Sequence, residues 1–422
     1  MIKILILGGG FGGVRTALDL EKKLTHPTSS GQEKIEITVV NRNPYHLFVS
    51  ALYEIASAYG LKKDPFAVQL KKTVCLPYSD IFENKKINLI EAEIIDVNLN
   101  DREVRTKGDT VLNYDYLVFS LGSETEDYNI PGVKEYAYKF KSLEDAILIN
   151  KKLEELSEEF ESNTRTDPFS FLICGGGFAG VELAAELSCC SKAIEKRCKF
   201  KGRYSSITLF EASPKILPMV SDKERKAIVE RMTKLGIIIM ESSSVEEVGS
   251  DFIKLKTGQR VSGDIIIWNA GVRANSILKG IADLPLTQKG AIIVNANLSV
   301  KGFGNIFAVG DNIEFNDMKN QKVVPRLAYV AINQGKIAAK NIEAVIKNKR
   351  MKSYDPFYSI WIASIGGKYA IAHLWRRLLI KNGFLGWLVR ELVDLQYLLS
   401  IFTPIKAMRI FWDEITIFSK ND

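Results

Sequence analysis

Apolar residues gather in short runs along the chain, and two of these runs share the same surroundings. Residues 2–7 and 169–174 are each followed by a glycine-rich turn and then by a helical pattern. A second short apolar run comes after each helix, at residues 35–40 and 207–210. Strand, helix and strand in this order, with apolar strands, predict parallel sheets covered on both faces. The repeat therefore predicts an α/β protein with two Rossmann-like dinucleotide-binding domains.

Other segments divide the chain further. Residues 114–122, 263–271 and 305–311 each predict a strand that runs into a glycine. Residues 25–34 are polar and predict a surface loop, and the charge-rich residues 151–167 predict a helix that leads into the second domain. A third region is expected to start near a basic run at residue 347, after which aromatic residues become more frequent.

Both turns carry the pattern G-x-G-x-x-G, at residues 8–13 and 175–180. In such a turn the first glycine permits the tight bend, the second lets the backbone approach a pyrophosphate, and the third lets the helix pack against the strand. The phosphates then lie at the helix N-terminus, where free N–H groups favour negative charge. Each turn has a strand before it and a helix after it, which makes the pattern far more specific than a lone match.

The residue that ends the second strand of each unit bears on which nucleotide binds. Glu211 ends that strand in the later unit, and a carboxylate there accepts both ribose hydroxyls and repels a 2′-phosphate, which favours NADH over NADPH. Lys215 lies near enough to weaken that preference. The matching residue of the first unit is Asn41, which can hydrogen-bond a ribose without selecting by charge, or can simply belong to the turn before Pro44.

Composition and charge narrow the class of protein. The chain has 422 residues, of which 46% are hydrophobic and 25% charged, as in ordinary globular proteins. A net charge of +7 favours anionic partners, but without a long basic run it does not indicate nucleic acid. The 5 cysteines are odd in number and show no C-x-x-C spacing, so they predict reduced thiols and neither a disulfide framework nor a metal site. The N-terminus predicts a buried strand rather than a signal peptide, and no uninterrupted run of about 18 apolar residues predicts a membrane-spanning helix.

The strand-to-glycine segments at 114–122 and 305–311 resemble those of the pyridine nucleotide:disulfide oxidoreductase superfamily. In that superfamily a Gly-Asp pair, here Gly310 and Asp311, lies near the end of the FAD domain. The resemblance implies that the first turn binds FAD and that Asp311 holds the ribityl chain of the flavin, although an Asp that only caps a loop is the alternative. The paired redox cysteines of the glutathione reductase type and the cysteines of sulfide:quinone oxidoreductases have no counterpart here, which argues against a thiol relay.

Within that superfamily the chain is more similar to the type II NADH:quinone oxidoreductases, which are single-chain respiratory dehydrogenases that pump no protons. The likeness covers residues 1–346 and more loosely the rest. It rests on Asn-Pro-Tyr-His at 43–46, on residues 175–182, on Glu-Ala-Ser-Pro-Lys-Ile-Leu-Pro at 211–218 and on Trp-Asn-Ala-Gly-Val-Arg at 268–273.

The resemblance also implies a quinone site and a catalytic acid. The family segment A-Q-x-A-x-Q-Q-G lies near the flavin and the quinone, and here it keeps Gln334 and Gly335 but carries Tyr329 and Asn333 in place of glutamine. These departures leave the type of quinone open. Glu182, expected in the first turn of the second helix, matches an acid that assists catalysis in the family; an acid that favours the helix dipole is the alternative. His46 and His373 are candidates for proton delivery, but a histidine chosen from sequence alone is more often structural, so neither is expected to be catalytic.

The C-terminal residues predict helices that lie on a membrane. Residues 384–402 are apolar but interrupted by Arg390, Glu391, Asp394 and Gln396, and residues 405–418 continue with further aromatic residues. Tryptophan and aliphatic residues beside basic ones suit an interfacial helix. The basic residues in question are Arg376, Arg377, Lys381, Lys406 and Arg409. A dimer interface, or a helix folded onto the core, is the alternative.

Together these observations predict FAD bound by residues 1–140 and 286–346, NADH bound by residues 141–285, and a region at 347–422 for membrane docking or dimerisation. NADH would deliver hydride to the flavin, and a membrane quinone would take the electrons. The protein is expected on the cytoplasmic face of the cell membrane, as a homodimer. The alternatives are a soluble NADH-dependent reductase of a small electron-transfer protein and a flavin-bearing NADH sensor. The expected cofactor contacts are Gly8, Gly10, Phe11, Gly12, Gly13, Asn41, Arg42, Ile94, Leu121, Gly122, Gly310, Asp311, Ala328, Gly175, Gly177, Phe178, Ala179, Gly180, Glu211, Ala270 and Gly271; Tyr329, Asn333 and Gln334 are expected at the quinone.

Overall fold

A computed structural model describes residues 1–25, 34–58, 66–162, 164–197, 204–374, 378–380 and 383–421. Most of the predicted loop at 25–34, and Cys198, Arg376, Arg377 and Lys381, lie outside these residues. The chain divides into two compact units. Unit 1 consists of Met1–His46, Cys75–Glu124 and Val272–Tyr358, and unit 2 of Leu47–Val74, Thr125–Gly271 and Ser359–Asp422.

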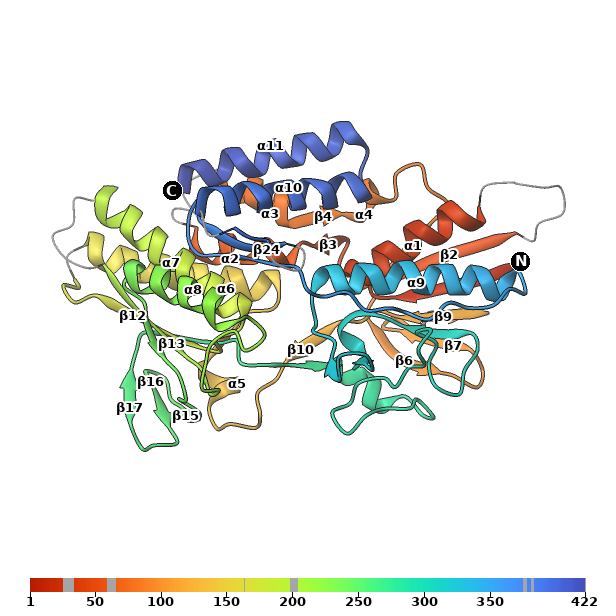
Figure 1. The fold of residues 1–422 in the computed structure, drawn as a ribbon, viewed down its shortest axis with the longest axis horizontal. Coiled ribbons are helices and arrows are strands. Elements are labelled where there is room, and N and C mark those ends of the chain that lie inside the picture. Colours follow the sequence, from red (N-terminus) through yellow and green to blue (C-terminus); the bar gives the residue numbers. More distant parts are fainter. Residues whose placement is uncertain are drawn as a thin grey trace. The chain divides into compact units, whose positions relative to one another are not determined.

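Unit 1 is built on a five-stranded parallel sheet with the strand order β20-β9-β1-β2-β5 (Figure 1). Residues 4–7 of β1 are buried, as a central parallel strand covered on both faces requires. Helices α1 and α9 pack together beside this sheet. The bounds are β1 Ile2–Leu7, α1 Phe11–Leu24, β2 Ile35–Asn41, β5 Asn88–Glu91, β9 Tyr116–Phe119, β20 Ile306–Ala308 and α9 Ala328–Ile346. A three-stranded antiparallel sheet is formed by β6 Ile94–Asn98, β7 Glu103–Thr106 and β8 Val111–Asn113.

Unit 2 repeats the plan with the order β11-β18-β12-β13-β14, again parallel throughout. The strands are β11 Tyr138–Lys139, β12 Phe169–Cys174, β13 Ser205–Phe210, β14 Ile238–Met240 and β18 Ile265–Trp268. The helices are α2 Leu52–Ser57, α3 Phe66–Val74, α6 Leu143–Glu161, α7 Phe178–Arg197 and α8 Asp222–Leu235. A three-stranded antiparallel sheet follows β14, with β15 Val245–Val248, β16 Phe252–Leu255 and β17 Arg260–Ser262. The two predicted strand–helix–strand units are therefore confirmed.

One predicted helix has different bounds. Residues 151–167 were expected to be helical, whereas α6 spans Leu143–Glu161. A capping box starts it early, because the Ser142 side chain accepts from the Asp145 N–H while the Asp145 carboxylate accepts from the Ser142 N–H. Pro168 lies just before β12 and disfavours helical backbone at Asp167.

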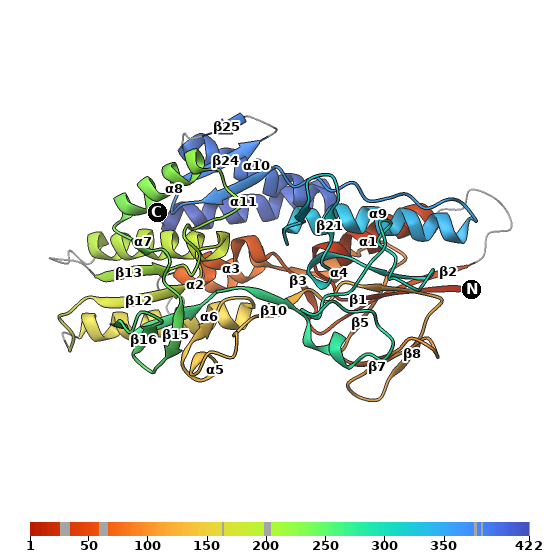
Figure 2. The ribbon, with the colours of Figure 1, turned by 60° about the horizontal axis from the view of Figure 1, so that its bottom comes forward.

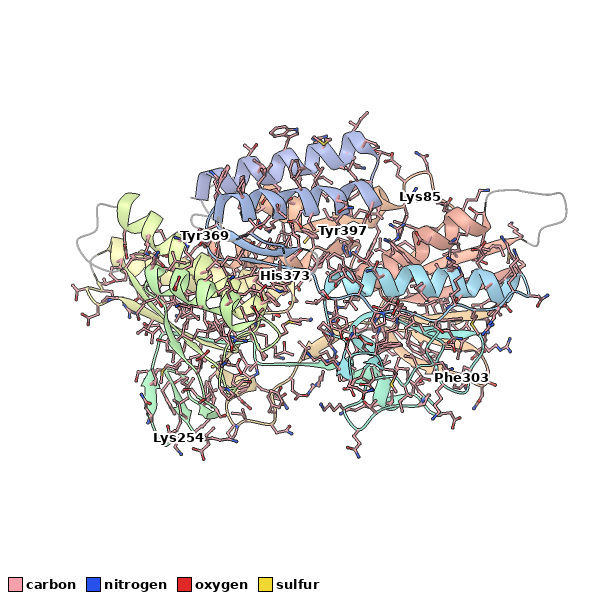
Figure 3. All side chains as sticks on the ribbon, in the orientation of Figure 1. Lys85, Lys254, Phe303, Tyr369, His373 and Tyr397 are labelled. Atoms are coloured by element: carbon pink, nitrogen blue, oxygen red, sulfur yellow. The ribbon has the colours of Figure 1, made fainter. Side chains whose placement is uncertain are left out.

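The C-terminal part of unit 2 begins with an antiparallel sheet that the sequence pattern did not reveal. It consists of β23 Trp361–Ser364, β24 Ala370–Leu374 and β25 Leu378–Ile380. His373 lies on β24 and Tyr369 comes just before this strand (Figure 3). The predicted C-terminal helices follow as α10 Gly383–Ile401 and α11 Pro404–Asn421. They run side by side, and α10 also packs against β24 (Figures 1 and 2). Among the helices described, none has the length and apolar character needed to cross a membrane.

Candidate functional site

The first glycine turn joins β1 to α1, and at Gly8, Gly12 and Gly13 the surrounding protein leaves no room for a side chain. Gly8 has φ +97°, and a methyl group on it would lie 2.3 Å from the Ser120 carbonyl oxygen. A methyl group on Gly13 would lie 2.0 Å from the Gly8 carbonyl oxygen, and one on Gly12 would lie 2.9 Å from Val309. These contacts account for glycine where the chain bends and where the helix meets the strand.

Gly10 is different, because nothing in the protein requires it to lack a side chain. It precedes α1 with φ −71°, and a methyl group there would meet no atom within 4 Å. No side chain caps the N–H groups at this end of α1. A glycine that faces open space beside uncapped N–H groups fits a bound pyrophosphate. Phe11, the next predicted contact, is half-buried and packs edge-on against His46.

The second turn, between β12 and α7, repeats the pattern, with Ala179 at the position of Gly12. Gly175 has φ +120°, and a methyl group on it would lie 2.5 Å from the Asn269 carbonyl oxygen. A methyl group on Gly180 would lie 2.0 Å from the Gly175 carbonyl oxygen. One on Gly177 would meet nothing within 4 Å. The residues of this turn thus also fit a dinucleotide. Phe178 begins α7 and packs against Trp361, with ring centres 5.7 Å apart, and Ala179 follows it.

Each turn is braced by a side chain at the end of the neighbouring strand, Asn41 as the last residue of β2 and Glu211 as the residue just after β13. Asn41 Oδ1 accepts from the Gly9 N–H at 2.9 Å, and its Nδ2 donates to the Asn43 carbonyl at 2.9 Å. Glu211 Oε2 accepts from the Gly176 N–H at 2.7 Å, and Oε1 accepts from the Ser213 N–H at 2.7 Å. The two residues hold equivalent positions, so both have a structural role beside the ribose contact predicted for them. Arg42, beyond the strand, is exposed.

Two further side chains hold the first turn, and sequence reasoning assigned neither to it. The Gly9 carbonyl oxygen lies 3.0 Å from His46 Nδ1 and accepts from the Tyr78 hydroxyl at 2.6 Å. Both side chains are buried. Burial lowers the pKa of His46 to about 4, against the smaller raising effect of the hydrogen bond to Gly9. His46 is therefore a neutral structural residue at pH 7.

Acid is expected to loosen unit 1 through His46. Its pKa falls from 6.5 in the unfolded chain to about 4 in the fold, so its contribution is complete above 6.5 and is lost as the pH falls toward 4. The shift corresponds to roughly 3 kcal/mol. We expect His46→Gln to lose less stability than the wild type between pH 7 and pH 4.5, as followed by circular dichroism and by release of bound flavin. An equal loss in both proteins would contradict the prediction.

The second half of unit 1 brings the Gly310–Asp311 pair beside a hydrogen-bonded serine. Ser123 Oγ donates to Asp311 Oδ2 at 2.6 Å. Gly310 has φ +75°, and its N–H donates to Gln334 Oε1 at 2.7 Å. Gln334 is 2% exposed, so in this structure its side chain supports the Gly310 turn. Its predicted contact with quinone, like the ribityl contact of Asp311, stays a prediction.

The other predicted contacts of unit 1 lie on several elements. Tyr329 and Asn333 are half-buried on α9, which Ala328 begins, and the Tyr329 hydroxyl donates to the Phe357 carbonyl at 2.6 Å. Leu121 and Gly122 follow β9, and Gly122 has φ +74°. Ile94 is half-buried at the start of β6.

In unit 2, Ala270 and Gly271 follow β18, as predicted for the strand-to-glycine segment. Gly271 has φ +84°, and a methyl group on it would lie 2.2 Å from the Tyr128 hydroxyl. The Trp268 indole N–H donates to the Glu126 carbonyl at 2.8 Å, which fixes the end of this strand. The segment therefore has a close backbone approach of its own, and its contact with the cofactor stays a prediction.

Glu182 lies deeper in α7 than the sequence suggested. The helix begins at Phe178 and has no acid in its first turn, so the expected first-turn position was wrong. The side chain is half-buried, and Oε1 accepts from the Ser364 N–H of β23 at 3.2 Å. Burial raises the pKa of Glu182 to about 7, against the opposing effects of the Ser364 N–H and Arg390. A carboxyl group with this pKa can both give and take a proton near neutral pH.

Solved structures of other proteins match the fold of this chain over nearly its whole length. The structure of NDH2 from Plasmodium falciparum in complex with NADH has a TM-score of 0.82 at 19% identity, covering 98% of this chain and 97% of that one. A sulfide:quinone oxidoreductase from Aquifex aeolicus has a TM-score of 0.75 at 18% identity, covering 94% and 91%. These likenesses establish the fold.

Sequence comparisons extend over nearly the same length. A type II NADH:quinone oxidoreductase of Staphylococcus saprophyticus is 25% identical over 385 residues, which are 89% of this chain and 90% of the relative. One from Staphylococcus aureus is 27% identical over 380 residues, 86% of this chain and 87% of the relative. The family model for pyridine nucleotide-disulphide oxidoreductases matches residues 2–335. Fold, glycine turns and family match agree, and the chain belongs to the pyridine nucleotide-disulphide oxidoreductase family.

Proposed function

We propose that the protein is a type II NADH:quinone oxidoreductase, in which unit 1 binds FAD and unit 2 binds NADH. The observation that carries the proposal is the pair of glycine turns. In each of them one glycine, Gly10 or Gly177, faces open space beside a helix N-terminus. The relatives named type II NADH:quinone oxidoreductases support the choice of donor and acceptor. FAD, when bound, supplies the hydride acceptor and the two-electron donor that the reaction needs.

The residues of the chain position the two cofactors and manage protons. The backbone N–H groups at the start of α1 and α7 would hold the pyrophosphates. Asp311 would accept hydrogen bonds from the ribityl hydroxyls, and Glu211 from the adenosine ribose of NADH. Glu182 would assist proton transfer to the quinone. We retain residues 1–140 and 286–346 as the FAD domain, 141–285 as the NADH domain and 347–422 as the docking region; these boundaries differ from the two compact units because they describe cofactor binding.

Absorbance spectroscopy tests this function directly. The purified protein is expected to show a flavin spectrum that bleaches on adding NADH and recovers rapidly on adding a short-chain quinone. Bleaching without rapid recovery for any quinone would favour the NADH-sensor alternative. A colourless protein that takes up no FAD on refolding would refute the proposal altogether.

Helix α10 supports a membrane as the place of reaction, because its charged side chains face the protein interior and its apolar side chains face outward. Its charged residues Arg390, Glu391 and Asp394 are buried, while Leu388 and Leu392 are exposed on the other side. The exposed apolar residues of α10 and α11 form what we call the apolar face, consisting of Phe384, Leu385, Leu388, Leu392, Val393, Leu399, Ile405, Met408 and Trp412. Side chains project outward along both helices in Figure 3. Exposed apolar residues gathered along two neighbouring helices mark an interaction surface.

We commit to a lipid surface as the occupant of the apolar face. Full burial of one large aliphatic or aromatic side chain stabilises by about 1.5–3 kcal/mol, so several of them suffice for docking. Arg409 is exposed and Lys406 half-buried on α11, where they can meet anionic headgroups. A lipid-soluble quinone also requires access from the membrane. We place the protein on the cytoplasmic face, and a homodimer remains an expectation from the sequence.

Replacing the apolar face is expected to release the protein from lipid. In the variant Leu388→Ser, Leu392→Ser and Trp412→Ser, binding to vesicles of anionic phospholipid in a flotation assay should fall on the order of 100-fold or more, since about 4 kcal/mol or more of apolar burial is lost. A matched control is Met318→Ser with Val323→Ser, two exposed apolar residues of unit 1.

The same assay separates the alternatives. If the triple variant floats like the wild type, lipid is not the occupant. A wild-type dimer that becomes monomeric in the variant, with no vesicle binding by either, would assign the face to a second copy of the chain. Full activity with a small electron-transfer protein after removal of residues 380–422 would favour the soluble-reductase alternative.

A further inference from the structure

The buried side of α10 is ionic, and it meets acidic residues from two other helices of unit 2. Glu54 of α2 is 3% exposed, Glu391 is 1%, Asp394 is 7% and Glu414 of α11 is 2%. We call these four residues the carboxyl cluster. Arg390 lies among them, at 3.3 Å from Glu54, 3.3 Å from Glu391 and 3.4 Å from Asp394.

The carboxyl cluster has more acid than its cation can neutralise. Within the described part of the chain, Arg390 is the cation whose charge acts on all four acids. Full ionisation of four carboxyl groups around one guanidinium would leave a net charge of −3 in the interior, which is strongly unfavourable. Protons therefore reside on these groups near neutral pH. Burial raises the pKa of Glu391 to about 7, and it raises the pKa of the other three as well.

Each acid also has an oxygen with no hydrogen-bond partner. These atoms are Glu54 Oε2, Glu391 Oε2, Asp394 Oδ2 and Glu414 Oε1, all buried. A set of carboxyl groups that served only to hold the helices together would be expected to use its oxygens in hydrogen bonds. Carboxyl oxygens that accept no hydrogen bond leave places where a proton can be taken up or released; of the four, Asp394 Oδ2 also forms the ion pair with Arg390 Nε at 3.4 Å.

The charges around the carboxyl cluster also act on Glu182. Tyr53 of α2 lies next to it, with the Arg390 guanidinium 5.6 Å from the centre of its ring. The charges of Glu54, Glu182 and Glu186 all act on the Tyr53 hydroxyl, and those of Arg390 and Asp394 act on Glu182. Strand β24 also packs against α10, but its titratable residue His373 is hydrogen-bonded to Glu224 and not to the carboxyl cluster. Charged groups of α10 thus act on Glu182 of α7, and Tyr53 of α2 lies within the influence of both Glu54 and Glu182.

We propose that the carboxyl cluster is a proton store that supplies, through Glu182, the proton consumed when quinone is reduced. The inference rests on the proposed function. In the balanced reaction, NADH, one proton and quinone give NAD⁺ and quinol. NADH provides two electrons and one hydrogen, so the second hydrogen of the quinol comes from a proton outside NADH. The carboxyl cluster gives up that proton and takes another from water.

The test compares an acceptor that takes up protons with one that does not. The full-length FAD-loaded variants Glu391→Gln and Asp394→Asn are assayed with NADH and a short-chain quinone, and again with NADH and ferricyanide, which is reduced without proton uptake. The quinone rate is expected to fall about ten-fold, at the low end of the usual contribution of acid–base groups, and the ferricyanide rate to stay unchanged. The matched control is Glu154→Gln on α6, which is similarly buried at 7% exposure.

The pH profile gives a second readout. The wild-type quinone rate should fall as the pH rises through about 7, since Glu182 and Glu391 then lose the protons they store. In Glu391→Gln this dependence should flatten. Equal quinone rates in all variants, or a parallel fall with both acceptors, would overturn the proton store. A wild-type protein that reduces no quinone would instead refute the proposed function.

Infrared spectroscopy of the wild type keeps the proposal testable if the variants do not fold. A band of protonated carboxylic acid is expected at pH 7 in the holoenzyme, and it should shrink as the pH rises to 9. Absence of such a band would overturn the proposal.

Discussion

Gly10→Val is expected to yield a folded protein that binds almost no FAD. Valine fits the protein at this position, because a methyl group on Gly10 meets no atom within 4 Å and the backbone has φ −71°. The side chain would instead occupy the space where a pyrophosphate meets the N-terminus of α1. Loss of two hydrogen bonds to phosphate, at about 1.5–3 kcal/mol each, weakens binding on the order of 100-fold or more. Flavin absorbance per protein measures the outcome.

Two glycines provide matched controls for this experiment. Gly304→Val also adds a side chain where no atom lies within 4 Å, but outside the turn, so it should keep its flavin. Gly13→Val should fail to fold, since its methyl group would lie 2.0 Å from the Gly8 carbonyl oxygen. A yellow Gly10→Val protein with normal flavin content would show that no pyrophosphate binds at this turn.

Glu211→Ala is expected to cause the second large effect, a loss of NADH binding with the flavin retained. The carboxylate accepts from the N–H groups of Gly176 and Ser213, so its removal leaves the second turn without its brace. Loss of two hydrogen bonds to a charged group, at about 1.5–3 kcal/mol each, is expected to raise the Kd of NADH on the order of 100-fold. Stopped-flow bleaching of the flavin at increasing NADH concentration measures this Kd.

Glu211→Asn separates the bracing role of Glu211 from its charge. Asn41 shows that an amide can hold the equivalent N–H in the first turn. Glu211→Asn should therefore keep most of the affinity for NADH but lose discrimination against NADPH, because the 2′-phosphate no longer meets a carboxylate. If the alanine and asparagine variants weaken NADH equally and both still reject NADPH, Glu211 does not select the nucleotide.

The local parts of the fold were predictable because their signals lie close together in the sequence. A strand, a glycine turn and a helix occupy about twenty consecutive residues, and steric rules for glycine fix their geometry. The position at the end of the second strand, Asn41 or Glu211, could be found in the sequence because it belongs to the same strand–helix–strand unit. The sequence did not reveal that these side chains hold the turns, because that depends on where the neighbouring strand ends relative to the turn.

Contacts between distant segments were beyond sequence reasoning. Nothing near Tyr78 in the sequence indicates that its hydroxyl reaches Gly9. The sheet β23–β25 was missed although the glycines at 366 and 367 mark its first turn. Arg390 and Asp394, one helical turn apart, looked like interruptions of an apolar segment. Only the packing of α2, α10 and α11 shows that they face inward. The sequence of α10 alone does not say which of its faces the other two helices cover.

The inward-facing charges of α10 limit how the protein could attach to lipid. Detached from the rest of unit 2, the helix would carry Arg390, Glu391 and Asp394 into the hydrocarbon region together with its leucines, at a cost of a few kcal/mol for each charge. It therefore cannot act as an independent anchor that swings out on a tether. In the docking that we propose, attachment and detachment would therefore involve unit 2 in its folded form, and residence at the bilayer would depend on the packed interior beneath α10.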